Sequence, residues 1–251
     1  MVGTVVSLMA SAIFCVESTI LGFSVEVPAE KFSPVSTAQM MMAADEVFID
    51  TFGTDMESKR AMMMDVQAYI DAVSSTSETP TVKATVIDKD KANEKMRLSL
   101  STTDEGFIAS ELEVLSSRAG NTEDSINDFL CATLSYPDGD FQDLSLSSVQ
   151  ATAKGSLKSG KAVCMGYANS FTVLAEGAGI RSVKVRGYIK DTLHVVNVVD
   201  GGLVIDVTWN DKSDNEFFLI PISEYCDKTG FVPVVDYQTA FEMKYGVALR
   251  S

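Results

Sequence analysis

The segment from residue 160 to residue 220 limits the possible folds of this chain more than any other. An apolar stripe of helical spacing opens it, formed by Tyr167, Phe171, Leu174 and Ala178. Short strand-like stretches follow at residues 182–189, 194–199, 203–209 and 216–220. The turn Asp200-Gly201-Gly202 separates the second stretch from the third and predicts a hairpin. A helix followed by an antiparallel meander predicts an α+β domain.

The rest of the chain shows further elements on both sides of a polar break. Helical spacing of apolar residues predicts helices at residues 38–52, 56–73, 108–115, 122–136, 146–157 and 237–249. The polar sequence SSTSETP at 74–80 is the best candidate boundary, and alternation at 82–86 and 96–100 predicts two strands joined by the loop DKDKANE. We therefore expect a helical N-terminal region at 1–80 and a main domain at 81–251.

Composition excludes several classes of function. The formal charge of -15 and the pI near 4.4 argue against a nucleic-acid partner, which needs clustered Lys and Arg. The chain has one histidine and four cysteines without a CxxC pair, so an ordinary structural zinc site cannot be assembled and a disulfide framework is not expected. The loop DGDFQD lacks the glycine and distal glutamate of a calcium-binding EF-hand, so it is read as a turn. We expect neither a metal nor a cofactor.

The N-terminal 25 residues are largely apolar, but Glu17 interrupts the run and the first basic side chain is Lys31. A secretory signal has positive charge before its apolar segment, and a membrane span needs about 20 uninterrupted apolar residues. A trimmed signal, a buried helix and a buried strand pair all stay open for residues 1–25. We favour an export-related segment, hence an extracellular or cell-envelope location over a cytoplasmic one, and expect no stable membrane span.

Three residue types with a shared chemistry occur in the constraining segment. Cys164 precedes the apolar stripe, His194 is the only histidine, and Asp206 follows the DGG turn. A thiol attacks only as the thiolate, which a helix N-terminus and a neighbouring imidazole both favour. The predicted hairpin sets His194 opposite residues 207–209, close enough to Asp206 for a histidine–carboxylate hydrogen bond. Nucleophile, general base and orienter are therefore all present.

The motifs around these residues resemble those of the transglutaminase-like superfamily, in particular its bacterial cysteine-peptidase branch. They are GKAVCMGYANSF, then H-x-x-N-x-V, then D-V-T-W-N-D, and the resemblance covers about residues 105–220. It implies a papain-like or transglutaminase-like core in which a helix carrying the nucleophile packs on a small antiparallel sheet. It assigns Cys164 as nucleophile, His194 as base and Asp206 as orienter, and makes Tyr136 a candidate oxyanion donor.

The sequence departs from that pattern at two positions. Met165 follows the nucleophile where this branch often has Gln, and Val196 stands two residues after the histidine where an aromatic residue is usual. Both departures concern the walls of the site and remove no catalytic group. The resemblance implies a cysteine peptidase or amidase acting on a peptide or protein substrate. Two alternatives stay open: a protein-glutamine transglutaminase, and a non-catalytic binding or scaffold module that keeps the fold, with the methionine-rich helices 38–52 and 56–73 as its binding surface.

Overall fold

The structure is a computed structural model. It describes residues 18–19, 22–74, 80–87, 94–102, 107, 109–137 and 149–246. Most of the candidate export segment, including Cys15, lies outside these residues. So do the loop DGDFQD and most of the loop DKDKANE. Within the described part of the chain, no helix combines the length and the apolar character that a membrane span requires.

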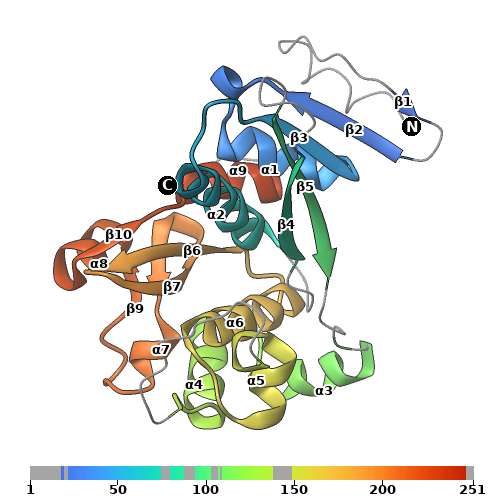
Figure 1. Ribbon diagram of the computed structural model, residues 1–251. Coiled ribbons are helices and arrows are strands. Elements are labelled where there is room, and N and C mark those ends of the chain that lie inside the picture. Colours follow the sequence, from blue (N-terminus) through green and yellow to red (C-terminus); the bar gives the residue numbers. More distant parts are fainter. Residues whose placement is uncertain are drawn as a thin grey trace. The chain divides into compact units, whose positions relative to one another are not determined.

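The chain divides into two compact units that are discontinuous in sequence. The first comprises Met1–Val66 and Val82–Ser101, and the second comprises Gln67–Thr81 and Thr102–Ser251. The expected division at residue 80 stays a prediction about domains, and the units are described here by their own boundaries. Both contain helices and a sheet, so the fold is α+β (Figure 1).

The first unit is built on a five-stranded sheet in the order β1-β2-β3-β5-β4. Its strands are β1 Ser18–Thr19, β2 Gly22–Val27, β3 Glu46–Asp50, β4 Pro80–Ile87 and β5 Lys95–Thr102. Helix α1, Pro34–Ala43, connects β2 to β3, which are parallel, and helix α2, Met56–Val73, begins in this unit. The short 3-10 helix η2, Ala29–Lys31, precedes α1. The predicted helix 56–73 and the predicted strands at 82–86 and 96–100 are thus confirmed.

The predicted helix at 38–52 is partly wrong. The helix is α1 and ends at Ala43, and residues 46–50 form strand β3. Val47 and Ile49 are fully buried while their neighbours are half-exposed, so the burial has the period of two that a strand requires. The helical spacing of the preceding methionines does not continue into this short alternating segment.

Helices form one layer of the second unit. They are α3 Ala109–Ala119, α4 Glu123–Thr133, the 3-10 helix η3 Val149–Ala151, α5 Ala153–Ser159 and α6 Cys164–Gly177. Thr122 caps α4, because its hydroxyl accepts a hydrogen bond from the Ser125 N–H and the Ser125 hydroxyl accepts one from the Thr122 N–H. Apolar side chains of α4 and α6 share one buried core, to which Ile126, Leu130, Tyr167 and Phe171 contribute. The helical patterns read from the sequence therefore mark faces that are buried together.

The sheet of the second unit has the order β10-β6-β7-β8-β9. Its strands are β6 Ser182–Ile189, β7 Thr192–Val199, β8 Leu203–Ile205, β9 Phe218–Pro221 and β10 Phe231–Pro233. The predicted DGG hairpin is confirmed: Asp200–Gly202 form the turn η4, and Asn197 pairs with Ile205 and Val199 with Leu203. The remaining helices are α7 Val207–Asn210, α8 Ile222–Thr229 and α9 Tyr237–Tyr245.

The strand predicted at 203–209 is wrong in its second half. β8 ends at Ile205, and Asp206 begins the short helix α7 by accepting a hydrogen bond from the Trp209 N–H. Asp is a preferred residue at this N-cap position because its carboxylate satisfies an otherwise free helix amide. The turn out of the sheet consequently occurs at the residue assigned as orienter.

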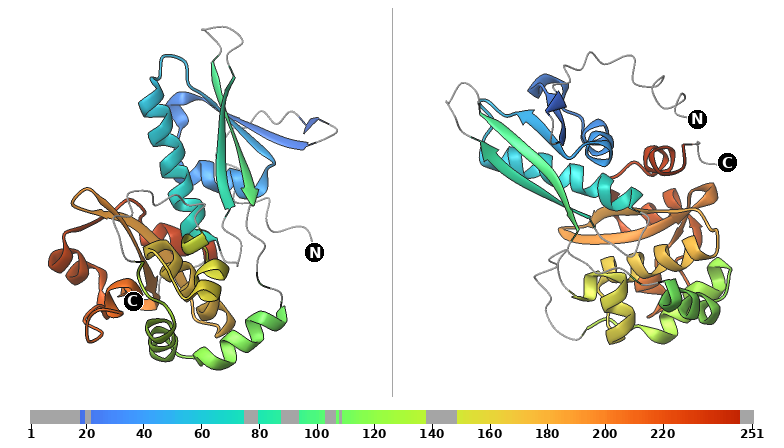
Figure 2. Two further views of the ribbon diagram at one scale, coloured as in Figure 1. Left: turned by 60° about the horizontal axis from the view of Figure 1, so that its bottom comes forward. Right: turned by 90° about the vertical axis from the view of Figure 1, so that its right-hand side faces the viewer.

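Helix α6 lies across β6 and β7, and Figure 2 shows this arrangement from two further directions. Polar contacts fix it there: Lys184 Nζ donates to Asn169 Oδ1 over 2.8 Å, and Asn197 Nδ2 donates to Thr172 Oγ1 over 2.9 Å. Burial lowers the pKa of Lys184 to about 8, and the charge of Asp71 opposes that shift. Because a buried polar side chain is costly without its partner, these contacts specify how the helix sits on the sheet.

Candidate active site

Cys164 is the first residue of α6, as the sequence predicted. The preceding residue, Val163, has an extended backbone and no side-chain acceptor, so no side chain caps the amides of the first turn. Only 3% of Cys164 is exposed, and its Sγ lies 4.0 Å from the carbonyl oxygen of Leu193 in β7. The thiol therefore stands at the positive end of a helix and against the strand that carries His194.

Gly166 allows a second segment to approach α6 at this end. A Cβ at Gly166 would lie less than 3.0 Å from the carbonyl oxygen of Gln150 and from the hydroxyl of Ser156. That carbonyl accepts hydrogen bonds from the Val163 N–H and from Ser156, while Asn169 Nδ2 donates to the carbonyl oxygen of Ala151. The segment 149–156 thus fixes the first turn of α6, and with it the position of Cys164.

His194 joins Cys164 to Asp206. Its Nε2 lies 2.8 Å from Asp206 Oδ2, and Cys164 lies close enough to the ring to raise the pKa of His194. Since Nε2 is used by Asp206, Nδ1 is the atom left for the thiol. The three side chains picked from the sequence are brought together, in the order thiol, imidazole, carboxylate.

The surroundings favour the charged form of His194. Burial lowers its pKa, but the charge and hydrogen bond of Asp206, with a smaller contribution from Cys164, raise the pKa to about 10. The imidazole also stacks on Trp209, with ring centroids 5.2 Å apart. An aromatic face attracts a cation, so Trp209 stabilises the same protonated state.

Phe231 packs edge-on against the imidazole, with centroids 6.4 Å apart. Its ring occupies the space where a Cβ of Gly187 would lie, and Gly187 pairs with His194 across β6 and β7. Glycine at this position therefore admits the Phe231 ring. Two aromatic rings hold the imidazole plane in place.

Asp206 has a further partner that sequence reasoning missed. The Tyr225 hydroxyl donates to Asp206 Oδ2 over 2.7 Å, and Tyr225 is fully buried. Tyr225 comes from α8, a helix that the sequence analysis did not predict. Apolar spacing at Ile222, Tyr225 and Cys226, followed by Gly230, was the available signal for that helix. Nothing in the local sequence indicated that its tyrosine meets Asp206.

Tyr136 lies close to the thiol. It packs against the buried cluster that contains Cys164, Met165 and Val195. Burial and the neighbouring Cys164 raise the pKa of Tyr136, so its phenol stays a hydrogen-bond donor. Backbone bonds between Ser135 and the residues on either side of Lys161 hold this segment beside the approach to Cys164.

The two departures from the family pattern are both buried. Met165 is 4% exposed and belongs to the cluster around Cys164, and Val196 is 1% exposed and pairs with Val185 inside the sheet. Two further polar residues near the site have clear contacts. Asn197 links β7 to α6, and Asp211 accepts a hydrogen bond from the Tyr167 hydroxyl over 2.7 Å.

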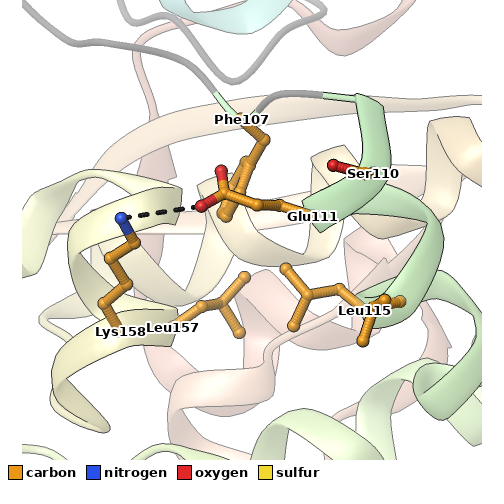
Figure 3. A pocket seen from close by; sticks show the side chains of 7 residues that line it. Phe107, Ser110, Glu111, Leu115, Leu157 and Lys158 are labelled. Atoms are coloured by element: carbon orange, nitrogen blue, oxygen red, sulfur yellow. Dashed lines mark ion pairs between the residues drawn. The ribbon is translucent and has the colours of Figure 1, made fainter.

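A hollow of about 440 Å³ lies between α3 and α5 in the same unit (Figure 3). Phe107, Leu115 and Leu157 give it an apolar lining, and the ion pair between Glu111 and Lys158, 3.8 Å long, crosses its rim. Its lining contains none of the residues around Cys164. Elsewhere in the described ranges, no cluster of three or more His, Cys, Asp or Glu side chains is arranged to hold a metal ion.

Comparison with known proteins gives only distant likenesses. No family model and no curated protein matches the sequence. A candidate cysteine protease from Cytophaga hutchinsonii is similar in structure with a TM-score of 0.35 and 13% identity, over 65% of this chain and 72% of that one. A TGase is similar with a TM-score of 0.33 and 9% identity, over 65% of this chain and 51% of the TGase, so the match spans about half of the TGase chain. Likenesses of this strength do not by themselves establish an activity.

Proposed function

We propose that this chain is a thiol-dependent acyl-transfer enzyme of the transglutaminase-like superfamily, acting on peptide or protein amides. The observation that carries the proposal is the hydrogen bond between Asp206 and His194, with Cys164 beside the imidazole. Each member has the chemistry that its role requires: a thiol at a helix N-terminus, an imidazole beside it, and a buried carboxylate that orients the imidazole.

The reaction follows from these positions. Cys164 Sγ, as thiolate, attacks the carbonyl carbon of the amide and forms a tetrahedral intermediate. The C–N bond then breaks, the nitrogen takes the proton carried by His194 Nδ1, and the acyl group remains on Sγ as a thioester. The Cys164 N–H at the start of α6 and the Tyr136 hydroxyl are the two donors that we assign to the developing oxyanion.

The second half of the reaction decides between hydrolysis and crosslinking. His194 takes a proton from the incoming nucleophile, which attacks the thioester carbon, and the Cys164 thiolate leaves. Water as the nucleophile gives a peptidase or amidase, and a primary amine gives a transglutaminase. We favour hydrolysis, because the sequence carries no signature of a lysine-binding channel.

Mass spectrometry of peptide libraries incubated with the protein tests the proposal. We expect cleavage or deamidation products that form equally with and without an added primary amine. Products that carry the amine would instead identify a transglutaminase. Absence of any product from a wide library, with no acyl adduct on Cys164, would favour the non-catalytic binding module.

Two cysteine variants control this experiment. Cys164→Ala removes the nucleophile and is expected to abolish product formation while the protein still unfolds cooperatively. Cys131→Ala removes a half-buried thiol of α4, whose Sγ lies 3.9 Å from the Val207 carbonyl oxygen, and is expected to keep activity. Equal activity of both variants would contradict the assignment of Cys164.

A further inference from the structure

We propose that Tyr225 is a positioning residue of this site. Its phenolic O–H holds the Asp206 carboxylate in one orientation and limits how strongly that carboxylate attracts the proton on His194 Nε2. The role as positioning residue rests on the proposed function. The effect of Tyr225 on His194 does not, and it can be measured without a substrate.

Asp206 Oδ2 accepts two hydrogen bonds at once. His194 Nε2 lies 2.8 Å from it and the Tyr225 hydroxyl 2.7 Å. The other oxygen, Oδ1, accepts the Trp209 N–H over 3.2 Å. A carboxylate with donors on both oxygens cannot rotate without losing one of them, so the direction toward His194 is fixed.

The two donors on Oδ2 compete for the same negative charge. A hydrogen bond to an ionised group draws electron density from it, and the effect is larger in a buried site than in water. Tyr225 therefore weakens the pull of Asp206 on the His194 proton. That matters for the proposed reaction, because a weaker pull on the Nε2 proton makes the imidazolium a stronger acid, and it must release its Nδ1 proton to the leaving nitrogen in each cycle.

Tyr225 is held firmly enough for this role. Its ring packs against Trp209, Phe217 and Phe231, with centroids 6.2, 5.8 and 5.5 Å away. Two of these rings, Trp209 and Phe231, also contact the imidazole of His194. Thr229 Oγ1 donates to the Tyr225 carbonyl oxygen over 2.7 Å at the end of α8. The hydroxyl thus reaches Asp206 from a rigid aromatic cluster that it shares with His194.

The titratable groups that act on His194 and Tyr225 come from α6, the start of α7 and α8. Cys164 faces both His194 and Tyr225 from α6, Asp206 faces both from the start of α7, and Cys226 acts on Tyr225 from α8. Burial and the charge of Asp206 raise the pKa of Tyr225, so the phenol remains a donor throughout the range where His194 titrates. A change in the titration of His194 on removal of the hydroxyl can therefore be assigned to the bond with Asp206.

A purely structural role makes a different prediction. A buried tyrosine hydroxyl needs some acceptor, and its loss then lowers only the free energy of unfolding. A positioning role predicts in addition that the pKa of His194 rises when the hydroxyl is removed, because more of the negative charge on Oδ2 becomes available to the imidazole.

The test is a histidine NMR titration of the full chain. His194 is the only histidine, so histidine labelled with ¹⁵N and ¹³C gives one ring and needs no assignment. Tyr225→Phe keeps the ring and removes the O–H. We expect its His194 pKa to lie above that of the wild type by about half a unit or more. Where a turnover assay exists, we expect kcat to fall about tenfold with KM nearly unchanged.

Tyr245→Phe is the matched control, since it removes a tyrosine hydroxyl that bonds the backbone N–H and carbonyl of Ser182, each over 2.9 Å. We expect a loss of stability there and an unchanged His194 titration. If Tyr225→Phe fails to fold, 3-fluorotyrosine in the wild-type chain keeps every ring and makes the phenols stronger donors, and the His194 pKa should then fall. A titration unmoved by the altered phenol overturns the proposal, whether or not the protein turns over a substrate.

Discussion

His194 Nε2 and Asp206 Oδ2 lie 2.8 Å apart, and both side chains are more than nine-tenths buried. A charged pair in such a place is held by its own hydrogen bonds and little by water. Removing either partner would leave the other as an uncompensated buried group. The pair is therefore both the proposed catalytic arrangement and a determinant of stability.

The first prediction concerns stability against pH. The pKa of His194 is raised from an ordinary 6.5 to about 10, so the folded protein binds this proton more tightly than the unfolded chain does. Its contribution to the free energy of unfolding is fully present below pH 6.5 and is lost as the pH rises through 10. The size is on the order of a few kcal/mol. Urea denaturation at pH 6, 8 and 10 measures it.

Asp206→Asn is the comparison that isolates this effect. Without the carboxylate charge, burial keeps His194 neutral, and the decline in stability above pH 6.5 should disappear. Lys184 acts in the opposite sense, since its pKa is lowered from 10.5 to about 8 and it favours folding as the pH rises through that range. Because both proteins contain Lys184, the difference between them cancels its contribution. Parallel pH profiles would show that Asp206 does not control His194.

Cysteine reactivity gives the second prediction. Burial raises the pKa of Cys131 to about 12, with help from the charges of Asp211 and Asp128. Burial also raises the pKa of Cys226. Both therefore remain thiols near pH 6, whereas Cys164 faces a protonated imidazole and the start of a helix. Iodoacetamide should alkylate Cys164 at least about tenfold faster than the other two, measured by peptide mass spectrometry.

His194→Ala should slow the alkylation of Cys164 near pH 6 and leave Cys131 and Cys226 unchanged. The imidazolium is the only histidine cation in the chain, so its loss removes the charge that favours the thiolate. If Cys164 reacts no faster than Cys131 in the wild type, the proposed thiolate–imidazolium pair is wrong.

The third prediction tests Tyr136 as an oxyanion donor. Removing one such donor typically lowers kcat by about 10² to 10³ and leaves KM little changed, because the bond forms only in the transition state. Tyr136→Phe should show this pattern with the peptide found in the substrate screen. Tyr188→Phe, which alters a tyrosine of β6 that is 39% exposed, should keep full activity. An unchanged kcat in Tyr136→Phe would show that Tyr136 is not an oxyanion donor and that backbone amides alone stabilise the oxyanion.

Much of the second unit follows from local sequence patterns. The apolar stripe of α6, the bounds of β6 and the register of the DGG hairpin all agree with expectation, because each depends on residues close in sequence. Helix α6 carries Cys164, and the hairpin sets His194 near Asp206. The candidate site is therefore readable from its own segment.

The remaining features depend on contacts that no local pattern contains. Strand β8 ends before Asp206 because the Asp206 carboxylate caps helix α7. Residue propensities alone do not decide whether this segment continues the strand or begins a helix. Tyr225 meets Asp206 only because α8 packs against β8, β9 and β10, and the sequence SEYCDK is compatible with many other placements. The sequence pattern predicts a single helix over α1 and strand β3, because five residues of alternation are a weak signal beside a methionine-rich helix.

The fourth prediction uses the two glycines of α6. A Cβ at Gly166 would meet a backbone carbonyl, that of Gln150, which cannot move without breaking its bonds to Val163 and Ser156. Gly166→Ala should therefore lower the free energy of unfolding by about 1–3 kcal/mol or more. Because the displaced bonds hold the first turn of α6, alkylation of Cys164 should also lose its selectivity.

Gly177→Ala is the matched change in the last turn of the same helix. Its Cβ would meet only the Ser116 hydroxyl, at 2.9 Å, and that side chain can rotate away. The helix preference of alanine over glycine, up to about 1 kcal/mol, then offsets the contact, so stability should be little changed or raised. Urea denaturation of both variants separates the two cases. If both glycines tolerate alanine equally, the close approach of residues 149–156 to α6 is not what fixes the position of Cys164.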